Sequence, residues 1–118
     1  MNEIAVTDYN QNLKPVNGTV AIYARVALDE NNDLKKQADM LIKNVEAVGE
    51  SCYSVYYECE SGRNHQRKEF LRLMTDIKNN KYKRLYIKDI SRLTRDFTKM
   101  NEIIENIRSA GVEIIVMQ

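Results

Sequence analysis

Residues 85–96 read LYIKDISRLTRD. The first six of these residues are mostly apolar and are typical of a buried strand. Beyond residue 96, apolar residues recur at the spacing of a helix: Phe97, Met100, Ile103, Ile104 and Ile107. Arg92 and Arg95 therefore lie where a strand ends and a helix begins, which is where open α/β sheets bind ligands. If both share the first helical turn, they can bind one anion together, and a phosphate is the natural candidate. The alternative is a solvated helix start with two surface charges.

Outward from this stretch, predicted strands and helices alternate along the chain. We expect strands over residues 19–26, 52–59, 84–90 and 112–117. We expect helices over residues 34–48, 67–79 and 97–110, of which the first ends at Gly49 and the last at Gly111. This alternation predicts a three-layer α/β fold, with helices on both faces of a mainly parallel sheet of four to five strands.

Residues 1–18 are predicted to form a polar N-terminal extension ahead of a single folded domain over residues 19–118. The extension contains the only proline, Pro15, and ends at a strong turn signal, Asn17-Gly18. Ile4-Ala5-Val6 could form a short edge strand, but we favour a loose extension.

The composition describes one globular domain. The 118 residues are 43% hydrophobic and 30% charged, which excludes a disordered chain. The apolar runs are too short to span a bilayer and no signal-peptide pattern opens the sequence, so we expect no membrane contact. Cys52 and Cys59 are too few for a disulfide scaffold, and their odd spacing argues against a shared metal. An intracellular protein is the favoured interpretation.

The net charge of +1 hides an asymmetry. Residues 60–100 carry 12 Lys or Arg and 5 Asp or Glu, whereas the remaining residues carry 6 and 12. This polarity indicates a basic face for a polyanion. A solvated surface explains four of these basic residues equally well, and it is the interpretation that we favour for them: Lys78, Lys81, Lys83 and Arg84.

Three crossovers from a strand to a helix each carry an arginine. Arg25 lies near the end of the first predicted strand, on the same side of the sheet as residue 27. Arg67 opens the second helix, and Arg92 and Arg95 follow the third strand. Together they could neutralise the oxygens of a phosphoryl group. Because no cluster of carboxylate, His or Cys ligands is visible, the arginines would do so without a metal.

The sequence resembles the catalytic domain of the serine recombinases, the family of resolvases, invertases and large transposon or phage integrases. The resemblance covers about residues 19–118. It rests on these motifs: Tyr23-Ala24-Arg25-Val26-Ala27, Gln37, Ser61-Gly62, Arg67-Lys68-Glu69-Phe70, Asp89-Ile90-Ser91-Arg92-Leu93-Thr94-Arg95-Asp96 and Gly111-Val112. It implies a site-specific recombinase that cuts and rejoins double-stranded DNA through a phosphoserine link, with no cofactor. It also implies a homodimer or tetramer when full length, in the prokaryotic cytoplasm at the nucleoid.

The resemblance also implies a set of site residues. Arg25, Arg67, Arg92 and Arg95 match the arginines that bind the scissile phosphate, with Ser61 and Ser91 beside them. Glu58, Gln37 and Asp89 match supporting positions. From the residues alone, Glu58 could equally pair with an arginine, Ser61 could shape its loop, and Ser91 could cap the third helix. His65 is expected to be exposed and idle.

Ala27 occupies the position of the nucleophilic serine. Alanine has no oxygen, so the chain as written cannot form the covalent intermediate, and its enzymatic status is open. One hypothesis is an inactivated variant of a working recombinase. A second is a natural pseudo-recombinase that binds DNA or a partner recombinase and regulates it, and a third is a flavodoxin-like phosphate-binding or signalling domain. The dimerisation helix and the DNA-binding region of the family are expected beyond Gln118, so weak DNA binding is expected of this stretch alone.

Overall fold

The strand β2, Val20–Val26, is an interior strand of the sheet and is buried along its whole length. It pairs in parallel with β3, Tyr53–Cys59, on one side and with β4, Arg84–Ile87, on the other. A continuous apolar run of this kind is typical of a parallel strand that is covered on both faces. The sheet is therefore built outward from β2.

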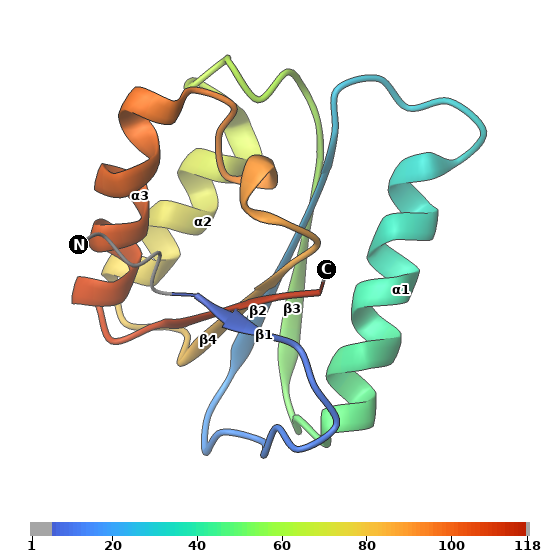
Figure 1. Ribbon diagram of the computed structural model, residues 1–118, viewed down its shortest axis with the longest axis vertical. Helices are drawn as coiled ribbons and strands as arrows, with labels where there is room; N and C mark the ends of the chain where they lie inside the picture. Colours follow the sequence, from blue (N-terminus) through green and yellow to red (C-terminus); the bar gives the residue numbers. More distant parts are fainter. Residues whose placement is uncertain (1–5, 118) are drawn as a thin grey trace.

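The computed structural model describes residues 6–117 and shows a five-stranded parallel sheet in the order β1-β5-β4-β2-β3 (Figure 1). Helix α1 covers one face, and α2 and α3 cover the other. The remaining elements are β1 Thr7–Asp8, α1 Asp33–Val48, α2 Lys68–Lys78, the 3₁₀ helix η1 Ile90–Arg92, α3 Phe97–Ser109 and β5 Glu113–Val116. The predicted three-layer α/β fold is confirmed. No helix within the described residues is long and apolar enough to cross a membrane.

Two apolar cores lie on the two faces of the sheet because successive side chains of a strand point to opposite sides. Ala21 and Tyr23 of β2 pack on the side of α2 and α3. Val20, Ile22 and Ala24 pack on the side of α1. The helices contribute apolar residues at the expected spacing, for example Ala38, Leu41 and Val45 of α1 and Met100, Ile103, Ile104 and Ile107 of α3.

The segment between β4 and α3 differs from the prediction. The strand ends at Ile87, and η1 follows because the Asp89 side chain accepts a hydrogen bond from the Ser91 backbone N–H (3.0 Å). Helix α3 begins at Phe97, as predicted, and its cap is Asp96, whose Oδ1 accepts from the Thr98 N–H (3.0 Å). The prediction that Ser91 caps this helix is therefore wrong.

The prediction of a loose N-terminal extension is wrong for the residues that the structure describes. Thr7–Asp8 forms an edge strand in parallel register with β5. Tyr9, Leu13 and Val16 then pack against the core on the α1 side. The edge strand considered at Ile4-Ala5-Val6 falls largely outside the described residues. Residues 7–16 thus belong to the fold, because apolar residues lie among the polar ones.

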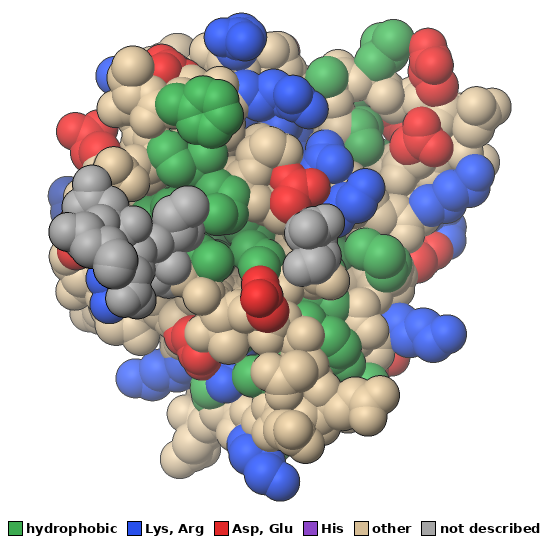
Figure 2. Space-filling view, in the orientation of Figure 1, with side chains coloured by type: hydrophobic (Ala, Val, Ile, Leu, Met, Phe, Trp, Pro, Cys, Tyr) green, Lys and Arg blue, Asp and Glu red, His purple; other side chains and the backbone are tan. Residues whose placement is uncertain are grey.

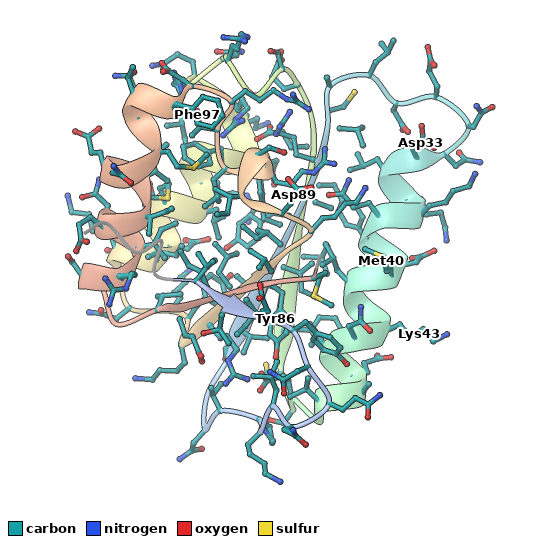
Figure 3. The ribbon with its side chains drawn as sticks, viewed as in Figure 1. Asp33, Met40, Lys43, Tyr86, Asp89 and Phe97 are labelled. Carbon is teal, nitrogen blue, oxygen red and sulfur yellow. The ribbon has the colours of Figure 1, made fainter. Side chains whose placement is uncertain are left out.

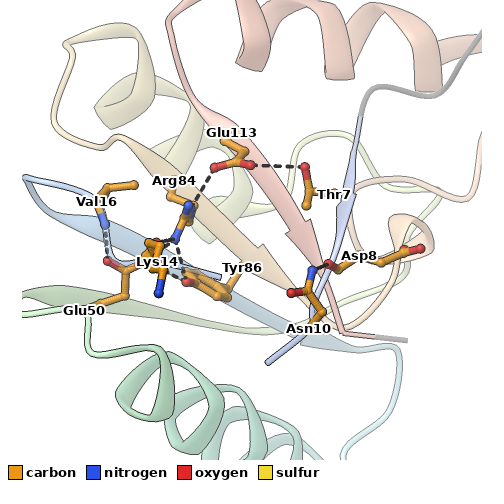
Figure 4. Close-up of polar contacts among 9 residues, drawn as sticks. All are labelled: Thr7, Asp8, Asn10, Lys14, Val16, Glu50, Arg84, Tyr86 and Glu113. Carbon is orange, nitrogen blue, oxygen red and sulfur yellow. Dashed lines mark hydrogen bonds and ion pairs between the residues drawn. The ribbon is translucent and has the colours of Figure 1, made fainter. Parts of the chain in front are cut away.

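Arg84 is buried, with only 6% exposure, so its assignment to a solvated surface is wrong (Figure 4). Its Nη1 donates to Glu50 Oε2 (2.7 Å) and to the Lys14 carbonyl (2.9 Å), and its Nε donates to Glu113 Oε1 (2.9 Å). Glu50 also accepts from Tyr86 OH (2.6 Å). This network joins the N-terminal segment to the sheet.

Candidate active site

Arg25 is buried at the carboxyl end of β2, with 1% exposure. Its Nε donates to the Arg92 carbonyl (3.0 Å), its Nη1 to the Glu60 carbonyl (2.9 Å) and its Nη2 to the Ser91 carbonyl (2.6 Å). Burial, followed by the nearby charge of Arg67, lowers the pKa of Arg25 to about 10. The guanidinium therefore joins two loops to the carboxyl end of β2.

Arg67 precedes the first residue of α2 and is equally buried. Its guanidinium lies over the Phe70 ring, 4.4 Å from the centroid, and 6.0 Å from the centroid of Tyr23. Nη2 donates to the Leu93 carbonyl, but Nε and Nη1 have no hydrogen-bond partner among the described residues. Burial lowers the pKa of Arg67. A desolvated cation with unpaired N–H groups costs free energy, and an anion would offset that cost.

Arg92 and Arg95 approach Arg25 from the segment after β4. Arg92 Nη1 donates to the Arg25 carbonyl (2.9 Å), and Arg92 Nη2 lies 3.6 Å from Asp89 Oδ2. Arg92 Nε finds no partner among the described residues. Arg95 has an exposed side chain, and its backbone N–H donates to the Gly62 carbonyl (3.1 Å). Arg25 and Arg92 bind each other's backbone carbonyls, Arg25 and Arg95 both flank Gly62, and the charges of Arg67, Arg92 and Arg95 all act to lower the pKa of Arg25. The four arginines therefore form one cluster.

The structure separates the two arginines that were expected to share a helical turn. Arg92 lies in η1 and Arg95 in the loop before α3. Arg25 and Arg67 are closed off from solvent instead of facing an open crevice. Whether these arginines bind a phosphate stays a prediction.

Gly62 fills the narrow space between Arg25 and Arg95. A Cβ atom at this position would lie 2.7 Å from Arg25 Nη2 and 2.8 Å from Arg95 Cγ. Both distances are shorter than real contacts allow, and Arg25 is held by three carbonyl groups. The close packing of Arg25 and Arg95 thus explains why the motif Ser61-Gly62 has a glycine at position 62.

Gly62→Ala is expected to lower the free energy of unfolding by about 1–3 kcal/mol, because the added methyl group must displace Arg25 or Arg95. Urea denaturation followed by circular dichroism measures this loss. Ser61→Ala is the control, since Ser61 is exposed and gives up only the hydrogen bond from the Arg63 N–H (3.2 Å). Equal stability of Gly62→Ala and the parent chain would contradict the assigned packing.

Glu58 supports the site by capping α2. Its carboxylate on β3 accepts from the backbone N–H groups of Glu69 (3.0 Å) and Phe70 (2.8 Å) and from Tyr23 OH (2.8 Å). Carboxylates are favoured at helix N-termini, where backbone N–H groups lack partners. Direct pairing with an arginine, the other possibility, does not occur within 4 Å among the described residues. The cap fixes the start of α2 and with it Arg67.

Gln37 and Asp89 form hydrogen bonds to backbone groups of the site. Gln37 Oε1 accepts from the Arg25 N–H (3.0 Å) and Gln37 Nε2 donates to the Arg25 carbonyl (3.1 Å), which joins α1 to the end of β2. Asp89 accepts from the backbone N–H and the hydroxyl of Ser91. Ser91 therefore has its hydroxyl engaged locally, and Ser61 shapes its loop.

His65 is half-buried, so the expectation that it is exposed and idle is wrong. Its Nε2 lies 2.9 Å from Thr94 Oγ1, and Thr94 is fully buried. Thr94 Oγ1 also accepts from the Asp96 N–H (3.0 Å). This contact joins the loop after β3 to the loop before α3. No sequence pattern relates residues 29 positions apart, so only the fold reveals it.

Ala27 follows β2 directly and is exposed at the carboxyl edge of the sheet. It offers no oxygen atom. The arrangement can bind and neutralise an anion with the arginine cluster, whereas position 27 itself supplies no nucleophile.

The structure is thus a three-layer parallel α/β domain with arginines gathered near the carboxyl ends of β2 and β4, which is where ligands bind in open α/β sheets. The family model "Resolvase, N terminal domain" matches residues 20–118. The chain belongs to this family, and the resemblance stated from its motifs is confirmed.

Solved serine recombinase structures share the fold. The C-terminal catalytic domain of ISC1926 TnpA, an IS607-like serine recombinase, is 32% identical with a TM-score of 0.77, over 83% of this chain and 67% of that one. The first ORF in transposon ISC1904 from Sulfolobus solfataricus P2 is 30% identical (TM-score 0.70), over 82% and 65%. The N-terminal catalytic domain of TP901-1 integrase is 25% identical (TM-score 0.75), over 84% and 77%. This chain thus spans about two thirds of the first two structures. No curated protein sequence matches it.

Proposed function

We propose that this chain is the catalytic domain of a site-specific DNA recombinase in which Ala27 replaces the nucleophile. The observation that carries the proposal is the cluster of four guanidinium groups, in which buried N–H groups of Arg67 and Arg92 have no partner among the described residues. Such groups favour a dianionic or phosphodiester ligand over water. The similar solved structures include an IS607-like serine recombinase, the first ORF of a transposon and an integrase, and these proteins agree with DNA as the substrate class.

With a serine at position 27, the reaction is a transesterification at phosphorus. The serine oxygen forms a bond to phosphorus, the bond from phosphorus to the 3′-oxygen breaks, and the 3′-hydroxyl leaves with the proton. Rejoining reverses this step. The arginines would stabilise the charge on the non-bridging oxygens in the transition state.

Access to the buried arginines requires a local rearrangement. Arg25 and Arg67 donate to the carbonyl groups of residues 91–93, which cover them. A phosphate that also takes over the N–H groups bound to those carbonyls must displace them, so η1 and the residue after it have to move. The exchange replaces neutral acceptors by charged ones, which form stronger hydrogen bonds.

Ala27→Ser, introduced into the longest natural reading frame that contains this chain, is expected to give a covalent protein–DNA adduct that protease treatment removes. Denaturing gel electrophoresis with a labelled duplex of the cognate site measures it. Ala47→Ser is the matched control, because residue 47 is exposed on α1 and should give no adduct. Persistent absence of an adduct from an Ala27→Ser protein that binds the duplex would contradict the proposal.

Ala27 itself favours a second candidate, a pseudo-recombinase that binds DNA or an active relative and regulates it. Such a protein would bind its site tightly, with a strong salt dependence, and stay chemically inert after Ala27→Ser. Double-stranded DNA as partner, a homodimer or tetramer, and a cytoplasmic location at the nucleoid remain parts of the proposal under either candidate.

A further inference from the structure

A hollow of about 400 Å³ lies on the α1 side of the sheet, at the carboxyl ends of β2 and β4. Its lining residues are Val26, Asp33, Lys36, Gln37, Met40, Lys88 and Arg92. Figure 3 labels Asp33 and Met40 on α1 and Asp89 on the segment that faces this helix. The hollow is thus bounded by α1 and by the residues after β4.

The hollow is basic. Three of its lining side chains are cationic, Lys36, Lys88 and Arg92, whereas Asp33 is the only acidic one. Neither lysine takes part in an ion pair within the described residues. Arg92 carries a buried Nε without a partner there, and its Nη2 lies 3.6 Å from Asp89, which is a weak contact. Figure 2 shows Lys and Arg side chains gathered on this side of the molecule, between the η1 segment and α1.

The hollow adjoins the arginine cluster without coinciding with it. Arg92 belongs to both, because it lines the hollow while its Nη1 donates to the Arg25 carbonyl (2.9 Å). Val26 lines the hollow, and Ala27 is the next residue. Position 27 is therefore adjacent in the chain to Val26 of the hollow and two residues from Arg25 of the cluster.

From this geometry we infer that the hollow binds the phosphate adjacent to the scissile phosphate on the same DNA strand, with Lys36 and Lys88 as its new contacts. The inference rests on the proposed function. A DNA strand with one phosphate at the arginine cluster has a neighbouring phosphate close by, and this hollow offers unpaired cations at the carboxyl end of β2, beside Arg92. Contacts to phosphate position DNA without reading its sequence, so Lys36 and Lys88 set the register of the strand at position 27.

The double variant Lys36→Gln/Lys88→Gln tests the inference through the salt dependence of DNA binding. Each neutralised phosphate contributes about 0.9 to the magnitude of the slope of log K against log salt. The double variant loses the one phosphate bound at the hollow, so the magnitude of its slope is expected to fall by about 0.9. Fluorescence anisotropy of a labelled duplex measures the slope. The protein used is the one encoded by the longest natural reading frame that contains this chain. Lys43→Gln/Lys78→Gln is the matched control, because these exposed lysines lie on α1 and α2 outside the hollow. The control should keep the parental slope.

Titration with inorganic phosphate separates a discrete site from diffuse surface charge. We expect saturable shifts of the backbone amide signals of residues 36, 37 and 88 in the parent chain, and their loss in Lys36→Gln/Lys88→Gln. A parental slope that both double variants retain would overturn the inference alone. Absence of any salt-dependent DNA binding by the parent protein would overturn the proposed function, and the inference with it.

Discussion

Glu50→Ala is expected to lower the free energy of unfolding by about 3–5 kcal/mol, because it removes one partner of a buried ion pair. The side chains of Glu50 and Arg84 are 0% and 7% exposed, and their atoms lie 2.7 Å apart (Figure 4). The substitution also removes the acceptor for Tyr86 OH (2.6 Å) and for the Val16 N–H (2.9 Å). Such a loss is a large part of the stability of an ordinary domain. Urea denaturation followed by circular dichroism measures it.

Glu113→Ala is the control for this prediction. Glu113 binds the same guanidinium through Arg84 Nε at 2.9 Å, but its side chain is 42% exposed. Solvent screens an exposed partner, so the expected loss is at most about 1 kcal/mol. Equal losses for Glu113→Ala and Glu50→Ala would show that burial does not decide the effect.

The same network explains why the sequence does not predict the observed order of the N-terminal segment. Residues 1–18 have a polar composition, which favours a loose extension. The segment is nevertheless held, because Arg84 donates to the Lys14 carbonyl and Glu50 accepts from the Val16 N–H. These contacts are made to backbone atoms, which every residue has, so they cannot be predicted from the residue composition of the segment.

The fold could be predicted because its signals are local. Apolar periodicity and the stop at Gly49 placed α1 within one residue of its observed start and end. The junction between β4 and α3 could not be predicted in the same way. There the Asp89 side chain accepts a hydrogen bond from the Ser91 backbone N–H, and η1 forms where the apolar pattern predicts that the strand continues.

The candidate site could likewise be predicted only in part. The positions of Arg25, Arg67, Arg92 and Arg95 follow from where strands end, and the fold brings them together. Their burial does not follow from position, because it depends on carbonyl groups that are 66 and 67 residues away from Arg25 in the chain. Likewise, the sequence offers Glu58 as a charge near arginines, whereas the structure uses it as a cap for α2.

Arg67→Met is expected to raise stability and to lower activity, and this opposite response separates a phosphate-binding role from a structural one. Methionine keeps the contact with the Phe70 and Tyr23 rings but removes a buried charge and two unpaired N–H groups. The one hydrogen bond lost, to the Leu93 carbonyl, contributes about 1 kcal/mol, whereas each buried unpaired group costs about 1–3 kcal/mol. The free energy of unfolding should therefore rise by about 1–2 kcal/mol.

In the Ala27→Ser protein, the same substitution should slow adduct formation by about 10²–10³-fold, because it removes donors that bind the phosphoryl oxygens. Arg72→Met is the matched control, since Arg72 is an exposed residue of α2 that lies over the Tyr56 ring and pairs with Glu69. It should leave the adduct rate unchanged. If Arg67→Met instead lost stability and kept the rate, the buried guanidinium would be a structural group, and the unpaired N–H groups would no longer argue for a phosphate. A gain in stability together with a slower reaction would mean that the domain keeps Arg67 at a cost to its own folding, because the transition state needs it.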